Sequence, residues 1–347
     1  MEEGTRELHV GKLVRREATD AMKAIKAEDL TKQYWFFEKE AGFAGSLRAL
    51  FSSKKVLVDA VRGIRMDVGV GETVGFIGPN GAGKTTTLKM LSGILHPTAG
   101  WVEVMGHVPS RREKNFLKGI ALITGQRNRL FWDLPAEEYF EFCRVVYEID
   151  ECLYRRNREA LVELAEIGDI LKVPQRKLSF GQRKRCELAA ALLHDPTVIF
   201  LDEPTNAMDL LSARRVRRFI REMGSEGRRT IILTSHIMAD IEEVCDRLII
   251  INRGQIVYDG GTRELNQGNG ITKRIRIVFG GPWERDLVEG LGKILEADDE
   301  EVLLEVESER SVEVASRLFA ALPVKDISIA EPPMERIIES LYLKGEP

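Results

Sequence analysis

A glycine-rich segment followed by lysine and threonine is the most chemically specific feature of this 347-residue sequence. It matches the pattern GxxxxGK[ST] and runs Gly78, Pro79, Asn80, Gly81, Ala82, Gly83, Lys84, Thr85, with Thr86 next. Glycines let the backbone curl so that successive N–H groups point inward, and a helix N-terminus adds partial positive charge. The pattern therefore predicts a polyphosphate-binding loop. In it Lys84 reaches the β and γ phosphates, Thr85 ligates Mg²⁺ and Thr86 touches the α phosphate.

The residues on either side of this loop supply the setting that the pattern requires. Thr73–Ile77 form an apolar run that predicts a buried strand, and Leu88, Leu91 and Leu95 recur on one face of a predicted helix. A glycine-rich turn that binds nothing is the alternative, and such a string is rare between a strand and a helix. The order of strand, glycine loop and helix therefore favours nucleotide binding.

Two carboxylates follow a second apolar run, Val198–Leu201. Asp202 and Glu203 thus lie at the carboxyl end of a predicted strand, where α/β sheets place ligand chemistry. Asp202 is predicted to hold Mg²⁺, through water, and Glu203 to orient and deprotonate the water that attacks the γ-phosphate. Taken alone, the segment also fits a strand that ends in solvated acids. The phosphate-binding loop makes the catalytic interpretation the stronger one.

The elements that position these residues are predicted from alternating strand-like and helical patterns, which favour an α/β fold with a mostly parallel sheet. Further strands are predicted at Thr197–Leu201, Thr230–Thr234 and Arg247–Ile251, and a helix from Ser212. A loose N-terminal extension is predicted at residues 1–22 and a P-loop core at 23–267. Within the core, residues of about 135–193 are predicted to form an all-helical insertion. A small C-terminal α/β domain is predicted at 271–347.

Composition narrows the function classes. The formal charge is only -4, so no global field attracts nucleic acid or an anionic membrane. The four cysteines show no CxxC spacing, which argues against a zinc site or a disulfide framework. The longest apolar runs are too short to span a bilayer, and the acidic N-terminus is unlike a secretory signal. The basic residues Arg214, Arg215, Arg217, Arg218 and Arg221 are interpreted as a solvated helix face.

Leu178-Ser179-Phe180-Gly181-Gln182, just upstream of the acidic strand, resembles the LSGGQ signature of ABC-type ATPases. Other elements of that family appear in order: Gln126 in a Q-loop, Asp202-Glu203-Pro204-Thr205, Asp209 ending a D-loop, and His236 after a strand. The resemblance covers about residues 23 to 265. Gly125-Gln126-Arg127 and Trp132-Asp133-Leu134-Pro135 narrow it to ATPase subunits of bacterial-type two-component exporters with separate permeases.

The resemblance implies further roles for residues in this sequence. Gln126 would complete the Mg²⁺ shell and sense the γ-phosphate, and His236 would hydrogen-bond the γ-phosphate and Glu203. In this family two copies bind ATP between them, so Ser179, Gly181 and Gln182 would face the ATP held by the partner's Lys84. Ser179 would also be a helix N-cap. Tyr34 best matches the position that stacks on adenine, although packing into a core is an equal alternative for it.

The resemblance also implies partners and a location. These are a homodimer or pseudo-twofold dimer of ATPase subunits, ATP with Mg²⁺, and a membrane permease that holds the chain on the cytoplasmic face of the cell membrane. No nucleic-acid partner is expected. A soluble ABC-type ATPase acting on a macromolecular complex is the alternative. The chain lacks the second nucleotide module, zinc cysteines or coiled-coil arms of such proteins, and a P-loop enzyme outside the family would not need the signature.

Several positions depart from the family pattern. Phe180 replaces the middle glycine of the signature, which is acceptable only if its ring points away from the ligand. Asn206-Ala207-Met208 replaces the commoner triplet before Asp209, and Ile237 replaces an acid after His236. Leu130–Pro135 is an apolar and aromatic stretch that, in the family, forms part of a groove for a permease helix. Its aromatic residues are also compatible with filling a core between subdomains.

Overall fold

The computed structural model describes residues 23–38, 54–125, 130–262, 264–265 and 272–344. Contacts divide the chain into two compact units, Met1–Asp259 and Gly260–Pro347. The predicted N-terminal extension, residues 1–22, lies outside the described residues. The other predicted limits, at 267 and 271, remain predictions. None of the helices in the described part of the chain combines the length and the apolar character that a membrane span needs.

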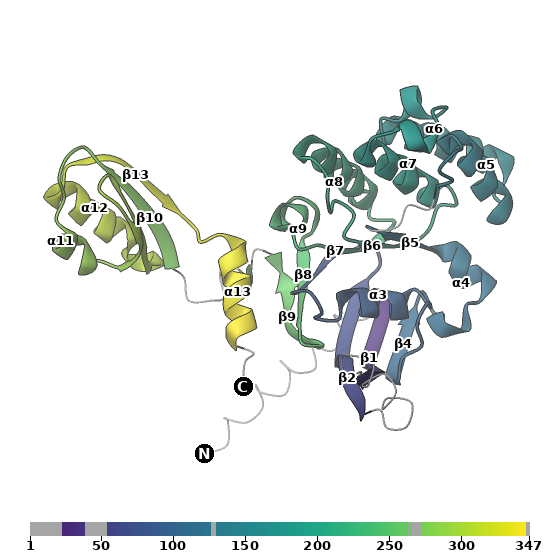
Figure 1. The fold of residues 1–347 in the computed structure, drawn as a ribbon, viewed down its shortest axis with the longest axis horizontal. Helices are drawn as coiled ribbons and strands as arrows, with labels where there is room; N and C mark the ends of the chain where they lie inside the picture. The colour runs from purple at the N-terminus through teal and green to yellow at the C-terminus, as the bar shows by residue number, and fades with distance from the viewer. Residues whose placement is uncertain (1–22, 39–53, 126–129, 263, 266–271, 345–347) are drawn as a thin grey trace, which may run out of the picture. The chain divides into compact units, whose positions relative to one another are not determined.

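A six-stranded sheet with the order β5-β6-β7-β3-β8-β9 is the scaffold of the first unit (Figure 1). Neighbouring strands from β5 to β8 are paired in parallel. Strands β6, β7 and β8 are almost wholly buried, as expected of parallel strands covered on both faces. The strands are β3 (Thr73–Ile77), β5 (Ile120–Thr124), β6 (Val198–Asp202), β7 (Thr230–Thr234), β8 (Arg247–Asn252) and β9 (Gln255–Gly261). The predicted, largely parallel α/β fold is therefore confirmed.

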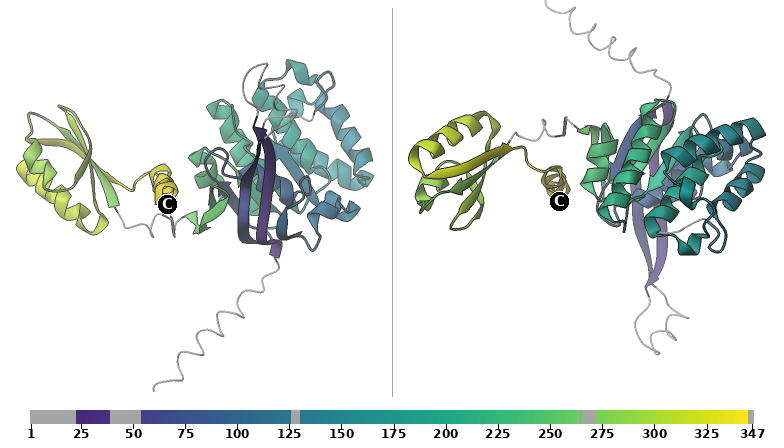
Figure 2. Two further views of the ribbon diagram at one scale, coloured as in Figure 1. Left: turned by 60° about the horizontal axis from the view of Figure 1, so that its bottom comes forward. Right: turned by 90° about the horizontal axis from the view of Figure 1, so that it is seen from above.

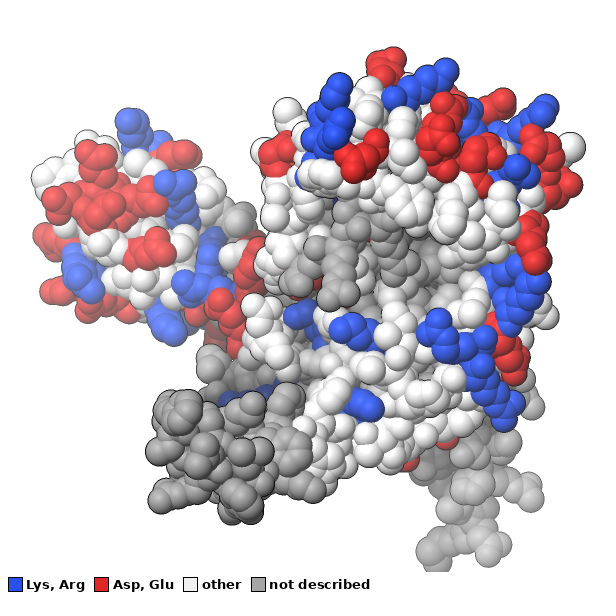
Figure 3. All heavy atoms as spheres, turned by 45° about the vertical axis from the view of Figure 1, so that its right-hand side comes forward, with Lys and Arg blue, Asp and Glu red and all other residues white. Residues whose placement is uncertain are grey.

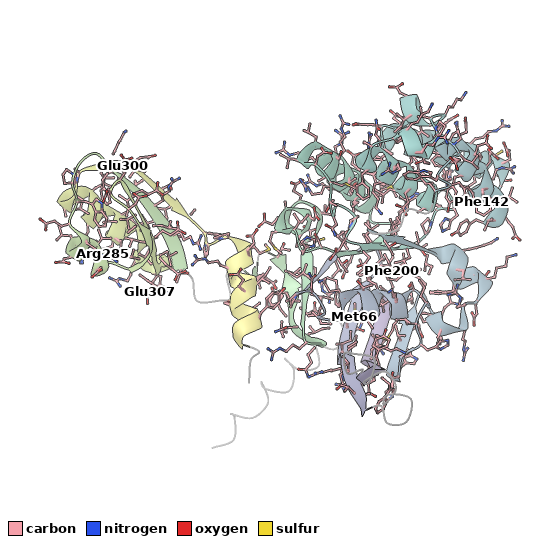
Figure 4. The ribbon with its side chains drawn as sticks, in the orientation of Figure 1. Met66, Phe142, Phe200, Arg285, Glu300 and Glu307 are labelled. Atoms are coloured by element: carbon pink, nitrogen blue, oxygen red, sulfur yellow. The ribbon has the colours of Figure 1, made fainter. Side chains whose placement is uncertain are left out.

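A second, antiparallel sheet with the order β2-β1-β4 lies on the other side of helix α3 (Figure 1). Its strands and that helix are β1 (Lys23–Glu38), β2 (Lys54–Gly69), β4 (Ala99–Val104) and α3 (Lys84–Leu91). One hydrophobic core joins this sheet, α3 and the parallel sheet, and includes Phe76, Leu88 and Phe200. Figure 4 places Phe200 in the middle of the unit. The sequence did not predict this sheet, because register shifts interrupt the alternation of β1 between Ala27 and Gln33.

The segment of the chain that connects β5 to β6 is helical. Figure 2 shows its helices together at one end of the first unit. No strand occurs between residues 136 and 192, which are all described. Helices α8 and α9 cover the face of the parallel sheet opposite α3 (Figure 1). The remaining helices of this unit that have six residues or more are α4 (Lys114–Gly119), α5 (Ala136–Val146), α6 (Glu151–Leu164), α7 (Phe180–Leu192), α8 (Leu210–Ser225) and α9 (Met238–Val244).

The second unit contains a four-stranded antiparallel sheet with the order β11-β12-β10-β13. Two helices pack on one face of it, because Val288 and Leu318 share a core with Ile275 and Ile277 of β10. Its β-α-β-β-α-β sequence is the ferredoxin-like arrangement, and the predicted small C-terminal α/β domain is confirmed. The elements are β10 (Thr272–Phe279), α11 (Arg285–Glu289), β11 (Lys293–Ala297), β12 (Glu301–Glu307), α12 (Ser311–Ala321), β13 (Val324–Ala330) and the last helix, α13 (Met334–Lys344).

Candidate functional site

The glycine-rich loop connects β3 to α3, as the sequence predicted. Gly81 and Gly83 have φ angles of 82° and 109°, which glycine adopts without a steric penalty. A Cβ atom on Gly83 would lie 2.4 Å from the carbonyl oxygen of Ala60, and one on Gly78 would lie 2.2 Å from that of Ile251. Neighbouring backbone thus lies too close to Gly78 and Gly83 for a side chain, so only glycine fits at these two positions.

The ammonium group of Lys84 lies over this loop. Its Nζ donates hydrogen bonds of 2.6 Å to the carbonyl oxygen of Gly78 and 3.1 Å to that of Pro79. Burial lowers the pKa of Lys84, and the carboxylates of Glu203 and Asp202 act in the opposite direction. The loop thus holds a cation at the position where a polyphosphate would lie.

Strands β3, β6 and β7 are neighbours in the sheet, so their carboxyl ends meet beside the loop. Asp202 ends β6, and its carboxylate accepts hydrogen bonds of 3.1 and 3.2 Å from the hydroxyl of Thr85. The hydroxyl of Thr234, the last residue of β7, donates to the same carboxylate at 2.8 Å. A hydroxyl and a carboxylate side by side are the oxygen ligands that Mg²⁺ prefers, so these residues fit the predicted ion.

Glu203 has a φ angle of 52°, in the left-handed region that disfavours residues with a side chain. Its backbone N–H donates to the carbonyl and the hydroxyl oxygens of Thr234, each at 3.0 Å. Its Oε1 lies 3.5 Å from Nδ1 of His236, which follows β7. Its Oε2 accepts a 3.0 Å hydrogen bond from the Asn206 amide. The structure thus brings together Glu203 and His236 as predicted and adds Asn206, which the sequence marked only as a departure.

These residues line one cleft of about 1200 Å³. Residues predicted to bind nucleotide or metal form part of its wall, namely Tyr34, Asn80, Gly81, Gly83, Lys84, Thr85, Thr86, Asp202, Glu203 and His236. Tyr34 lines the cleft rather than a core, and Lys32 Nζ lies 5.4 Å from its ring centroid. The cleft is large enough for a nucleoside triphosphate. Gln126, the predicted Q-loop residue, lies outside the described residues.

The signature residues do not line that cleft. Ser179 caps α7, because its Oγ accepts from the Gln182 N–H at 3.3 Å while Gln182 Oε1 accepts from the Ser179 N–H at 2.8 Å. Asp209 caps α8 by accepting from the Ser212 N–H at 2.9 Å, and hydrogen bonds from Ser212 lower its pKa. A Cβ on Gly181 would lie 2.3 Å from Ser212 Oγ, so the two helix starts touch.

The ring of Phe180 lies beside Arg183, one turn along α7. The Cζ atom of Arg183 is 6.0 Å from the centroid of the Phe180 ring and 5.1 Å from that of Trp132. Arg183 Nη1 also donates a 2.6 Å hydrogen bond to the carbonyl oxygen of Leu178. The guanidinium group therefore connects the substituted signature position to the aromatic stretch at 130–135.

The basic run on α8 was predicted to be a solvated face, and for Arg217 this is wrong. Arg217 is only 4% exposed and its Nη1 lies 3.1 Å from Asp240 Oδ1. The helical periodicity of the sequence could have shown this. Arg217 lies on the same helix face as four apolar residues that are buried, namely Ala213, Val216, Ile220 and Met223. The other arginines of the run are exposed, and Arg218 pairs with Glu166.

Comparison with known proteins agrees with this geometry. The ABC transporter family model matches residues 61–206, and a model of the EvrA-like ABC transporter C-terminal domain matches residues 272–330. A solved dimeric structure of an ATP-binding cassette in a post-hydrolysis state, bound to ADP and Pi, has a TM-score of 0.56 at 21% identity and covers 68% of this chain and 98% of that one. The fold is that of an ATP-binding cassette.

Sequence relatives identify the family. ABC transporter ATP-binding protein NatA of Bacillus subtilis (strain 168) is 32% identical over 215 residues, which are 62% of this chain and 87% of that protein. Nod factor export ATP-binding protein I of Burkholderia orbicola (strain AU 1054) is 34% identical over 205 residues, or 59% of this chain and 67% of that protein. The chain belongs to the ATP-binding proteins of ABC transporters. It is the ATP-binding subunit of such a transporter.

Proposed function

We propose that this chain hydrolyses ATP as a dimer and thereby drives a separate membrane permease, in the direction of export. The observation that carries the proposal is the convergence of Lys84, Asp202, Glu203 and His236 on one cleft at the ends of adjacent parallel strands. A relative named for export supports the direction. The permease would hold the chain at the cytoplasmic face of the membrane.

In this proposal Glu203 is the general base. Its carboxylate accepts a proton from a water molecule as the water oxygen attacks the γ-phosphorus, and the bond from that phosphorus to the β–γ bridging oxygen breaks. Lys84 and the glycine loop bind the phosphates, while Thr85, Asp202 and Gln126 would hold Mg²⁺. That ion supplies positive charge against the phosphate oxygens. Asn206 holds one oxygen of Glu203 by a hydrogen bond, and His236 lies 3.5 Å from the other.

The signature residues act on the partner's nucleotide. Their absence from the wall of the cleft in the same chain supports this assignment, since Ser179 and Gly181 then need a second copy to reach a phosphate. Helix α7 begins at this point, and its N-terminus favours an anion. Each subunit would therefore supply half of each of two sites.

The test of this function is phosphate release by the purified chain with ATP and Mg²⁺, together with its sedimentation as a function of ATP. We expect turnover, and a dimer that forms only with nucleotide. Recovery with a co-expressed multi-span membrane protein encoded by a neighbouring gene tests the permease. A chain that binds ATP but neither hydrolyses it nor pairs with itself overturns the proposal.

Arg183 is expected to support turnover by holding the Phe180 ring away from the partner's nucleotide. Its two ring contacts are worth about 1 kcal/mol together at an exposed site, so Arg183→Ala should lower kcat about fivefold. Arg183→Lys should be milder because it keeps the charge. The measurement is steady-state ATP hydrolysis.

A double substitution tests whether Arg183→Ala lowers kcat because it frees the Phe180 ring. Phe180→Gly removes the ring that needs holding, so Arg183→Ala should have little effect on kcat in that background. An equal loss in both backgrounds shows instead that Arg183 acts through its other contacts, the hydrogen bond to Leu178 and the Trp132 ring.

The stretch from Leu130 to Pro135 fits a permease-binding surface. Phe131 and Trp132 are 44% and 54% exposed, so they do not fill a core. The Phe131 ring packs edge-on against Tyr139 and Phe142, with centroids 5.4 and 5.5 Å away. Figure 4 shows Phe142 at the outer edge of the helical layer, and Figure 3 shows a largely uncharged band below the mixed charges of that layer. Exposed aromatic clusters of this kind are typical interface anchors.

This surface is hydrogen-bonded to Gln175 and Arg176, which precede the signature in the sequence. The backbone N–H of Arg176 donates to the carbonyl oxygen of Trp132 at 3.0 Å, and that of Gln175 donates to Leu134 at 3.2 Å. Arg176 Nη1 also lies 2.9 Å from Asp133 Oδ1. A movement of the surface would therefore reach the start of α7 directly.

Trp132→Ala is expected to leave the isolated chain folded and able to bind ATP, but to abolish its recovery with the co-expressed permease. An interface hot spot contributes about 2 kcal/mol, or roughly a 30-fold loss of affinity. Trp101→Ala, a tryptophan 39% exposed on β4, is the matched control and should co-purify normally. Normal recovery of the Trp132 variant would place the coupling surface elsewhere.

A further inference from the structure

Behind the cleft, four side chains form a buried polar network. Asp240 on α9 is 1% exposed, and Thr205, Arg217 and Ser235 are 2%, 4% and 2% exposed. The Asp240 carboxylate accepts hydrogen bonds from the Thr205 hydroxyl, from the Ser235 hydroxyl at 2.6 Å and from Arg217 Nη1 at 3.1 Å. Arg217 Nε lies 3.1 Å from a carboxylate oxygen of Glu243. None of the four lines the nucleotide cleft.

One oxygen atom joins the two loops that carry the proposed chemistry. Asp240 Oδ2 accepts from both Thr205 and Ser235. Thr205 lies two residues after Glu203, and Ser235 lies directly before His236. The network therefore connects the backbone behind the base to the backbone behind the histidine.

The His236 segment is fixed on both sides. Ser235 Oγ also accepts a 2.9 Å hydrogen bond from the backbone N–H of Ile237, the residue after His236. The backbone N–H of Asp240 in turn donates to the carbonyl oxygen of Ile237 at 3.1 Å. The position of the histidine is thus set by groups that face away from the cleft.

The loop after Glu203 needs such an anchor. Glu203 and Ala207 both have positive φ angles, 52° and 60°, which cost side-chain-bearing residues about 1 kcal/mol each. Thr205 lies between them, and its hydroxyl is the buried attachment of this strained turn. Strained conformations persist only where the surroundings hold them in place.

We propose that Asp240 and Arg217 are positioning residues for ATP hydrolysis, acting through Thr205 and Ser235 to keep Glu203 and His236 at a fixed separation. Arg217 pairs with the buried Asp240 carboxylate, whose other oxygen accepts from both hydroxyls. The inference rests on the proposed hydrolytic function. It adds a buried linkage that sets the 3.5 Å approach of Glu203 to His236.

The experiment compares Thr205→Val with Thr205→Ser in the full chain. Valine keeps the shape of threonine but removes the hydroxyl, so kcat should fall about tenfold or more while KM for ATP changes less than about twofold, because the glycine loop is untouched. Serine restores the donor and should return kcat to within about twofold of wild type. Asp240→Asn is expected to reproduce the valine variant.

Controls separate positioning from stability and from the hydrolytic function itself. Arg214→Gln changes an exposed arginine on the same helix and should leave kcat unchanged. Thermal unfolding and ATP affinity are measured for every variant, and if Asp240→Asn fails to fold, the Thr205 pair decides. The positioning role alone is overturned if the wild-type chain hydrolyses ATP and Thr205→Val has an unaltered kcat. It is also overturned if Thr205→Ser does not restore kcat. A wild-type chain without turnover overturns the proposed function as well.

Discussion

Glu203→Gln is expected to bind ATP with near-normal affinity and to lose about 10²- to 10⁴-fold in turnover. Glutamine cannot take the proton from the attacking water, whereas its amide oxygen can still accept the hydrogen bond that Asn206 gives to Glu203. The loop should therefore keep its geometry while the reaction stops. With hydrolysis blocked, the variant should accumulate as an ATP-bound dimer.

Phosphate release and size-exclusion chromatography with ATP measure the two effects. Glu222→Gln, on the exposed face of α8, is the matched control and should behave as wild type. Turnover of the Glu203 variant within about threefold of wild type would rule out Glu203 as the general base.

Mixing Ser179→Arg with Lys84→Ala subunits is expected to restore activity that neither variant has alone. Lys84→Ala removes the cation of the glycine loop and should weaken ATP binding, whereas Ser179→Arg spoils the signature offered to the partner. Each heterodimer then contains one intact composite site. Because half the dimers in an equal mixture are heterodimers, turnover should approach about one quarter of wild type.

A control variant separates loss of the signature from loss of the helix cap. Ser179 is also the N-cap of α7, and losing a cap costs about 1 kcal/mol of stability. Ser179→Asp retains an acceptor for the cap but brings negative charge toward the partner's phosphate, so it should be stable and inactive. If heterodimers form and the mixture is no more active than its components, the signature does not act across an interface.

Residues whose roles depend on local sequence were the ones that could be predicted. The order of β3, glycine loop and α3 follows from a contiguous pattern, and so does the pair of carboxylates at the end of β6. Their approach to His236 also follows from the rule that parallel strands end at one edge of the sheet. The structure adds the distances, among them the 3.5 Å between Glu203 and His236.

Contacts between distant segments were not predictable in the same way. Arg217 has the same charge as its exposed neighbours, and only its place on the buried face of α8 distinguishes it. Its partner Asp240 is 23 residues away on another helix. The antiparallel sheet escaped prediction for a related reason, since the register shifts of β1 break the period of two that marks a strand.

The left-handed backbone conformation of Glu203 has a consequence for the evolution of this chain. With a φ of 52°, the position is one where a side chain makes folding less favourable, and where glycine would fit without strain. Selection for stability alone would tend to remove the carboxylate, and selection for turnover would retain it. A duplicated copy that pairs with an active subunit and contributes only its signature is no longer selected for its own turnover. Such a copy is expected to lose Glu203 early and to keep the rest of the fold.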